Sequence, residues 1–109
     1  MPNAAWKEWE REMGRYVGRT RSGPMGDALP DLPGPFLDIE CKYRSKLGIH
    51  QADFNQAKRN ARGKMWAVAL KEKKTGRRLV IMDALEWAKL LKLAEFAYSV
   101  RPELLSEGE

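Results

Sequence analysis

The stretch PDLPGPFLDIECKYR, residues 30–44, decides the fold of this chain. From residue 36 to about residue 44 the side chains alternate in character, and in a strand successive side chains point to opposite faces. One face would carry Phe36, Asp38, Glu40 and Lys42, and the other Leu37, Ile39, Cys41 and Tyr43. The second face is apolar enough to contact a core. The first places Glu40 and Lys42 ~6–7 Å apart along the strand.

Asp31 brings a second carboxylate close to this strand. It lies in the Pro/Gly-rich turn LPDLPGPF, nine positions before Glu40. An Asp and a Glu that converge beside a Lys offer Mg²⁺ two carboxylates with an ammonium next to them, which suits hydrolysis of a phosphodiester. A Glu-x-Lys pair is also common on solvated strand faces. The preceding Pro30-Asp31, the apolar flanks and the basic chain are what favour catalysis.

Helical spacing of apolar residues predicts an amphipathic helix at residues 3–17. Its apolar stripe consists of Trp6, Trp9, Met13, Tyr16 and Val17, of which Trp6 and Trp9 are expected in the core. Residues 18–35 are predicted to be loop-rich, with room for one short strand near Arg19 or Pro30.

The pattern after the central strand, 36–44, predicts two helices and two strands. We expect a helix at 53–62 that ends at Gly63, strands at 64–70 and 79–82, and a long helix at 83–98. Asp53 is a candidate N-cap or first-turn acid, and Asp83 a candidate N-cap. The last helix is expected to contact the core through Leu85, Ala88, Leu91, Leu93, Ala94 and Phe96.

These elements predict an α/β fold with a mixed central sheet flanked by helices, in the order α-β-β-β-α-β or close to it. Trp66 and Trp87 are expected to pack against that sheet. The 109 residues suffice for one domain with a modest core, at 1–101. A short acidic segment, 102–109, is expected to be a frayed tail.

The elements Pro30-Asp31 and Glu40-Cys41-Lys42 resemble the PD-(D/E)XK nuclease superfamily, which implies a restriction-endonuclease-like core. Three further features resemble the archaeal-type and phage Holliday junction resolvases within that superfamily. They are a first helix with a Glu-Arg pair at Glu10, a basic loop at 18–23 and a Gln in the next helix, Gln56. The resemblance covers roughly residues 5–95, and its specificity comes from the order and spacing of motifs that are each weak alone.

The resemblance implies an Mg²⁺- or Mn²⁺-dependent endonuclease acting on branched DNA. Asp31 and Glu40 would hold the metal, together with the backbone carbonyl of Cys41. Lys42 would orient or deprotonate the attacking water and stabilise charge on the phosphate. Glu10 would add a carboxylate, directly or through water, and Gln56 would orient Lys42 or the water.

Two acidic residues leave alternatives open. Asp27 competes with Asp31 for the metal, and Asp31 is preferred because Pro30 precedes it and its spacing to Glu40 suits a short hairpin. Asp38 lies on the predicted site face, where the resolvases usually have an apolar residue. It would either support the site as a second acid or be solvated at the strand end.

The chain is basic, with a net charge of +5 and a pI of about 9.5, which suits a polyanionic partner. Residues expected to line a phosphate channel are Arg19, Arg21, Ser22, Arg44, Lys46, Lys58, Arg59 and Arg62. A second basic cluster, at 71–78, lies farther away and is expected only to aid solubility. No element has the pattern of a base-reading helix, so we expect recognition of DNA shape and backbone.

Other classes of protein are disfavoured by the composition. One cysteine and one histidine, Cys41 and His50, argue against disulfides and zinc hydrolases. The sequence has no apolar run that could span a membrane and no secretory signal, so we expect a protein of the cytoplasm of a bacterial or phage-infected cell. Symmetric cleavage of two strands predicts a homodimer. Nicking, restriction-like or end-processing nucleases, and a non-catalytic DNA-binding module, remain alternatives.

Overall fold

The computed structural model describes residues 4–21 and 29–106. Its elements, in chain order, are α1 (Ala4–Val17), β1 (Leu37–Arg44), α2 (Gln51–Ala61), β2 (Met65–Glu72), β3 (Arg78–Met82), α3 (Ala84–Val100) and a short 3-10 helix, η1 (Pro102–Leu105). The chain is therefore an α/β protein, and η1 occupies the segment for which a frayed tail was expected.

The three strands form one mixed sheet in the order β1-β2-β3. β1 and β2 are parallel, with Glu40 opposite Val68 and Lys42 opposite Leu70, and β2 and β3 are antiparallel. Parallel neighbours need a crossover connection, and α2 supplies it. The stated order α-β-β-β-α-β is therefore wrong, whereas the elements expected at 36–44, 53–62, 64–70, 79–82 and 83–98 occur in that sequence as β1, α2, β2, β3 and α3.

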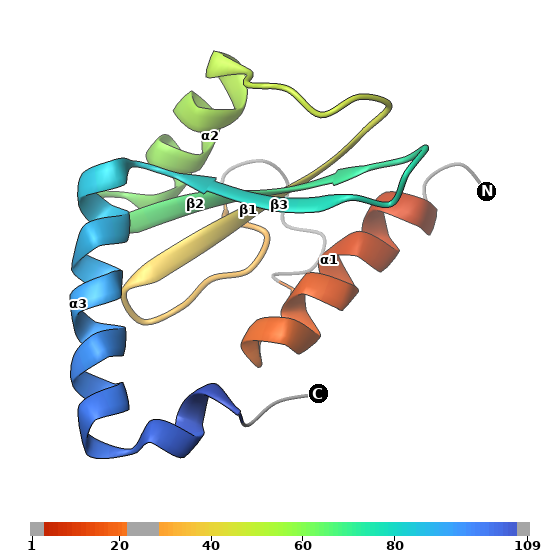
Figure 1. Cartoon of the computed structure of the whole chain (residues 1–109). Helices are drawn as coiled ribbons and strands as arrows, with labels where there is room; N and C mark the ends of the chain where they lie inside the picture. Colours follow the sequence, from red (N-terminus) through yellow and green to blue (C-terminus); the bar gives the residue numbers. More distant parts are fainter. Residues whose placement is uncertain (1–3, 22–28, 107–109) are drawn as a thin grey trace.

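The two faces of the sheet are covered by different helices, α1 on one and α2 on the other (Figure 1). On the α1 face, Trp9 and Met13 pack against Leu37, Ile39 and Cys41. The indole of Trp9 also donates a hydrogen bond of 3.1 Å to the carbonyl of Ala69. On the α2 face the core is smaller, with Ala57, Val68 and Leu70 at its centre. Leu37, Ile39 and Cys41 are buried, so the prediction that this face of β1 contacts the core is confirmed.

Two groups of apolar residues lie outside the core that was predicted for them. In α1, Trp6, Tyr16 and Val17 are exposed, because only the Trp9–Met13 part of the stripe reaches the sheet. In α3 no residue is buried. The expected core residues Leu85, Leu91, Leu93, Ala94 and Phe96 are all exposed, as is Trp87. α3 runs along one end of the sheet instead of covering a face (Figure 1).

The ends of the helices follow the expected local chemistry. Asp83 caps α3, accepting hydrogen bonds from the backbone N–H groups of Leu85 and Glu86. Asp53 is a first-turn acid of α2 and does not cap it, because the helix begins two residues earlier than expected, after His50. Within residues 4–21 and 29–106, no helix has the length and apolar character needed to cross a bilayer.

Candidate active site on β1

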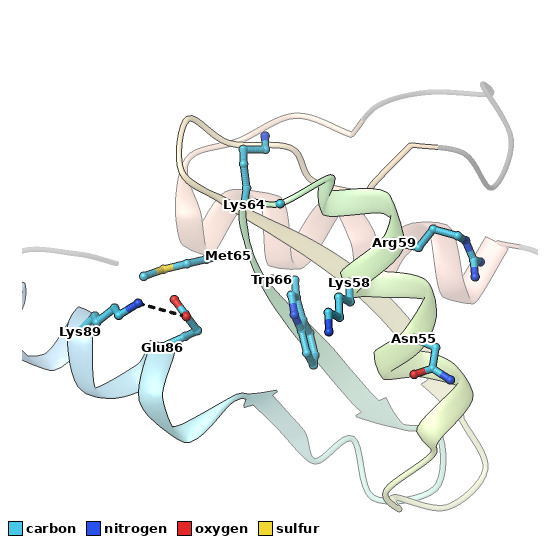
Figure 2. A pocket seen from close by; sticks show the side chains of 9 residues that line it. Asn55, Lys58, Arg59, Lys64, Met65, Trp66, Glu86 and Lys89 are labelled. Atoms are coloured by element: carbon cyan, nitrogen blue, oxygen red, sulfur yellow. Dashed lines mark hydrogen bonds and ion pairs between the residues drawn. The ribbon is translucent and has the colours of Figure 1, made fainter.

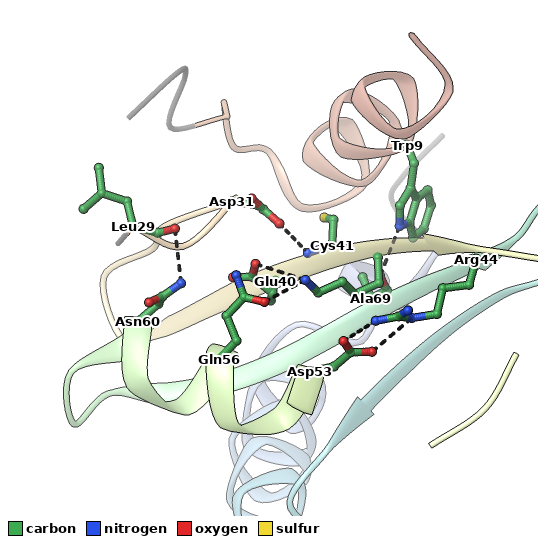
Figure 3. A network of polar contacts seen from close by, with 11 residues as sticks. Trp9, Leu29, Asp31, Glu40, Cys41, Arg44, Asp53, Gln56, Asn60 and Ala69 are labelled. Carbon is green, nitrogen blue, oxygen red and sulfur yellow. Dashed lines mark hydrogen bonds and ion pairs between the residues drawn. The ribbon is translucent and has the colours of Figure 1, made fainter. Parts of the chain in front are cut away.

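The α2-facing side of β1 carries the carboxylate and the ammonium that the alternation predicted, those of Glu40 and Lys42. Figure 3 shows Glu40 on this side, with Gln56 of α2 near it. Glu40 is buried, with 4% of its surface exposed, and Lys42 is half-buried. The Lys42 Nζ lies 3.9 Å from Glu40 Oε2. The strand and its parallel partner β2 fix the spacing of these two groups, since both residues lie inside the paired register.

Asp31 is held against the same strand from its outer edge. Its neighbour Leu32 forms an isolated antiparallel bridge with Ile39, so residues 31–32 return alongside β1 as the short hairpin spacing predicted. The carboxylate Oδ2 of Asp31 accepts a 2.8 Å hydrogen bond from the backbone N–H of Cys41. This bond fixes the carboxylate beside the Glu40–Cys41–Lys42 segment.

Gln56 reaches the site from α2. Its Oε1 accepts a 2.7 Å hydrogen bond from Lys42 Nζ, so the side chain fixes the position of the ammonium (Figure 3). Of the two tasks expected for Gln56, orienting Lys42 is the one that this contact provides.

Glu10 comes from α1 and is 4% exposed. Its Oε1 accepts a 2.6 Å hydrogen bond from Arg21 Nε, which also makes the pair a salt bridge. Burial raises the pKa of Glu10, the hydrogen bond from Arg21 opposes the rise, and the negative charge of Asp31 adds to it. The residues expected to act together, Glu10, Asp31, Glu40, Lys42 and Gln56, are thus contributed by α1, the 31–32 segment, β1 and α2.

The protein's own cations do not fully neutralise the carboxylates of the site, so the site favours an additional positive charge. Burial, followed by the negative charge of Asp31, raises the pKa of Glu40 to about 8. Burial also raises the pKa of Asp31 and of Glu10, although Lys42 and Arg21 oppose the shifts. Uncompensated carboxylates of this kind are stabilised by a proton or by a bound metal ion.

One carboxylate oxygen of Glu40 lacks, within the described chain, a partner that would offset the cost of burying it. Glu40 Oε1 is buried and has no hydrogen-bond partner among the described residues. A buried acceptor without a partner is costly unless an ion or water occupies the position next to it. The oxygen donors of Asp31 and Glu40 have the chemistry that Mg²⁺ or Mn²⁺ prefers. Within the described residues, however, no three Asp, Glu, His or Cys side chains are arranged closely enough to hold a metal by themselves.

Asp38 shares the face of Glu40 but has another task. It is 2% exposed and accepts hydrogen bonds from the backbone N–H of Gly34 at 3.0 Å and from Lys64 Nζ at 2.9 Å. The alternative of a solvated acid at the strand end is therefore wrong. Asp38 ties the 34–36 turn to the start of β2, and Lys64 neutralises it.

Several predicted DNA-binding residues are engaged within the protein. Arg19 donates to the backbone carbonyl of Leu37 at 2.6 Å, and its guanidinium fills the space next to Gly34, where a Cβ would come within 2.2 Å of it. Arg44 forms a salt bridge with the buried Asp53. Lys46, Lys58, Arg59 and Arg62 remain exposed. Ser22 and Asp27 lie outside the described residues.

Asn60 is a site residue that the sequence interpretation missed. It is 5% exposed on α2, and its amide lowers the pKa of Glu40 by hydrogen bonding. It also lies close to the 29–31 segment (Figure 3). Asn60 follows Gln56 by four positions, so the two share one face of the helix. That spacing was the available signal.

Comparison of the chain with protein-family models, with curated proteins and with solved structures gave no match in any of the three.

The stability of the metal-free protein is expected to fall as the pH rises from about 5 to 8. Glu40 titrates near its ordinary pKa of 4.5 when unfolded and at about 8 when folded. Between these values the folded state binds a proton that the unfolded state has released, so the free energy of unfolding decreases with pH. Thermal unfolding in EDTA should show this slope, and Mg²⁺ should raise the Tm more at pH 8 than at pH 5.

Glu40→Gln is the control, because it removes the titrating group while keeping its size. The variant should have a smaller pH slope and a smaller rise in Tm with Mg²⁺. A slope identical to that of the unsubstituted protein would contradict the assignment of the shifted pKa to Glu40.

Proposed function

We propose that this chain is a metal-dependent DNA endonuclease of the PD-(D/E)XK type that cuts branched DNA, with four-way junctions as its preferred substrate. The observation that carries the proposal is the buried Glu40, with one unpartnered oxygen, set between Asp31 and the hydrogen-bonded pair Lys42–Gln56. The arrangement around Glu40 leaves a buried carboxylate incompletely compensated and fixes an ammonium 3.9 Å from it. An ion pair with a purely structural role would not need an uncompensated oxygen of this kind.

Asp31 and Glu40 would hold the metal, and the Cys41 carbonyl and Glu10 would complete its coordination directly or through water. A bound Mg²⁺ or Mn²⁺ polarises the phosphate and lowers the pKa of a water molecule. Lys42, fixed by Gln56, stabilises the negative charge that builds on the phosphate and orients the attacking water. Because Lys42 is positioned before substrate arrives, this stabilisation requires little reorganisation.

A cationic groove next to α2 supports a nucleic-acid substrate. A cavity of about 660 Å³ lies between α2, β2 and the start of α3. Figure 2 shows Lys58 beside Trp66, with Arg59 also on α2. Lys64 and Lys89 line the groove as well and are paired with Asp38 and Glu86. Lysines and arginine attract phosphates, and an aromatic ring can stack on a base. The groove flanks the helix that carries Gln56, so DNA bound there would extend from the proposed site.

A nuclease that cuts two strands symmetrically needs two sites. The described part of the chain contains one constellation of the kind above, so the active form would be a two-fold homodimer.

The direct test is incubation of the purified protein with labelled four-way junction, flap and linear duplex DNA, with Mg²⁺ and with EDTA. Metal-dependent cutting of the junction in preference to linear duplex is expected. Equal cutting of all three substrates would indicate another nuclease function. Binding without any cleavage in Mg²⁺ or Mn²⁺ would indicate a DNA-binding module and contradict catalysis.

Charge reversal at Arg59 and Arg62 should make junction binding less dependent on salt. Both residues are exposed, and Arg59 lies three positions from Gln56, on the adjacent part of the helix surface. Each phosphate contact contributes ~0.9 to the slope of log K against log salt, so losing two contacts should reduce the slope by about 1–2. Fluorescence anisotropy in EDTA at several salt concentrations measures this.

A matched charge reversal in the β2–β3 hairpin serves as control. Lys74 and Arg77 are exposed there, whereas their neighbours Lys71 and Arg78 form salt bridges with Glu12. Lys74→Glu/Arg77→Glu should change the slope less than Arg59→Glu/Arg62→Glu. The reverse ranking would place the DNA on the hairpin instead of α2.

A further inference from the structure

The groove between α2 and α3 is distinct from the candidate active site on β1. Its cavity of about 660 Å³ is lined by residues of α2, the start of β2 and the first two turns of α3, and by none of the five candidate catalytic residues. Cavities of this size hold small organic ligands, a class to which a nucleotide belongs. A DNA duplex, whose major groove alone is ~12 Å wide, is too large to enter such a cavity.

Trp66 supplies the aromatic surface of this groove. Its indole is half-buried and forms part of the cavity wall. Phe54 of α2 packs against it, with 5.9 Å between the ring centroids and 36° between the ring planes. Because β2 holds its backbone and Phe54 holds its ring, the indole is in position before a ligand arrives. An aromatic ring fixed in a cationic groove is the kind of platform on which single-stranded nucleic acids stack their bases.

Two cations of the groove are available to an external anion. Lys58 and Arg59 are exposed on α2, and neither side chain is paired with an acid among the described residues. The two other lysines of the groove are neutralised by carboxylates. Figure 2 shows Lys58 beside Trp66, so a base stacked on the indole would bring its own phosphate close to this ammonium.

Stacking on Trp66 requires a base with an open face. In a duplex the neighbouring base pairs cover both faces of a base, whereas an unpaired base can present its ring to an aromatic side chain. We propose that this groove binds a single-stranded segment of DNA, with one base stacked on Trp66 and backbone phosphates on Lys58 and Arg59. The amide oxygen of Asn55 accepts a hydrogen bond from Gln51, which leaves the amide N–H groups of Asn55 to donate to the edge of the base.

The groove and the proposed catalytic site use neighbouring faces of one helix. Asn55 and Arg59 are four positions apart and share a face of α2, and Gln56 lies ~100° around the helix from Asn55. A strand bound in the groove would therefore pass close to the site that Gln56 serves. The branched substrate of the proposed nuclease would then carry an unpaired strand next to the branch. This inference rests on the proposed function only in taking DNA as the ligand.

Binding of a fluorescent oligothymidylate in EDTA tests the groove in the absence of cleavage. Trp66→Leu should weaken this binding by about tenfold or more, the scale of losing one stacked base, and should leave the binding of a blunt hairpin duplex nearly unchanged. Trp66→Phe keeps a ring and should retain most of the affinity. Trp87→Leu is the matched control, because Trp87 is an exposed tryptophan of α3 that does not line the groove.

Three results would overturn the proposal. They are single-strand binding that Trp66→Leu leaves unchanged, an equal loss in Trp87→Leu, and an equal loss of single-strand and duplex binding in Trp66→Leu. Tighter binding of oligouridylate than of oligothymidylate would assign the groove to RNA and would also overturn it.

Photocrosslinking keeps the test independent of how Trp66→Leu folds, because it uses the unsubstituted protein. An oligonucleotide with a halogenated uracil in place of one thymine should crosslink to Trp66, as identified by mass spectrometry of the digested adduct. Crosslinking to Trp6 or Trp87 without Trp66 would overturn the proposal, since both lie outside the groove lining.

The outcomes separate this groove from the catalytic proposal. A protein that binds oligothymidylate through Trp66 but cuts no DNA in Mg²⁺ or Mn²⁺ supports the groove and contradicts the nuclease. A protein that cuts four-way junctions, but whose binding of single strands is unaffected by Trp66→Leu, overturns the groove and leaves catalysis intact.

Discussion

Glu40→Gln is expected to abolish metal-dependent cleavage, with a loss of ~10³-fold or more in rate, while junction binding stays near normal. The substitution removes the carboxylate that we propose binds the metal, which is 4% exposed and whose Oε1 has no partner in the described protein. Asp31→Asn should act in the same way, and its amide oxygen can still accept the hydrogen bond from Cys41 N–H. Single-turnover cleavage of a labelled junction and binding in EDTA measure the two effects separately.

Asp38→Asn is the matched control for Glu40→Gln. Asp38 is a buried carboxylate of the same strand and face, two positions earlier, but it is neutralised by Lys64. Its loss should cost about 1–3 kcal/mol of stability, because a buried charge-assisted hydrogen bond is weakened, and should leave the cleavage rate within a few fold. Cleavage retained by both Glu40→Gln and Asp31→Asn, or lost equally in Asp38→Asn, would contradict the site.

The predictable part of this protein is the part governed by local period and spacing. Alternation along residues 36–44 correctly separated the core face, with Ile39 and Cys41, from the face with Glu40 and Lys42. Asp83 at the start of α3 was recognisable because capping depends on neighbouring backbone groups only. The hairpin-like return of residues 31–32 beside β1 followed from a short, proline-rich connection.

The parts that were missed depend on partners distant in sequence. Arg19 was expected on a DNA-binding surface, but its guanidinium is partly buried against Gly34 and donates a hydrogen bond to the carbonyl of Leu37. Asp38 could not be recognised as neutralised before Lys64 was known to lie opposite it. A position in the sequence gives the charge of a side chain, whereas its partner is set by the fold.

The last helix shows a further reason for failure. The apolar residues of α3 were assigned to the core of the monomer, since apolar periodicity shows that a face is buried but not against which surface. In the structure none of these residues is buried, and the apolar residue of α3 that packs against the core is Leu90, which was not among them.

Lys42→Ala should lower the cleavage rate by ~10²-fold or more, the scale of losing one preorganised group that stabilises charge in the transition state. Lys42 is half-buried and lies on the site face, away from the α1 core, so folding should be largely unaffected. Its Nζ is held by Gln56 Oε1 at 2.7 Å, and Gln56→Ala should therefore cause a smaller loss in the same direction. The observed first-order rate at saturating protein, measured with and without excess Mg²⁺, separates this effect from metal affinity.

Lys46→Ala is the control for Lys42→Ala, because Lys46 is an exposed lysine just beyond the end of β1. It should change binding slightly and the cleavage rate very little. If Lys46→Ala instead caused the ~10²-fold loss and Lys42→Ala were mild, the ammonium acting on the phosphate would come from the loop after β1, not from the strand. The assignment of Gln56 would then fall as well, since Gln56 contacts Lys42 and acts in the proposed site through that residue alone.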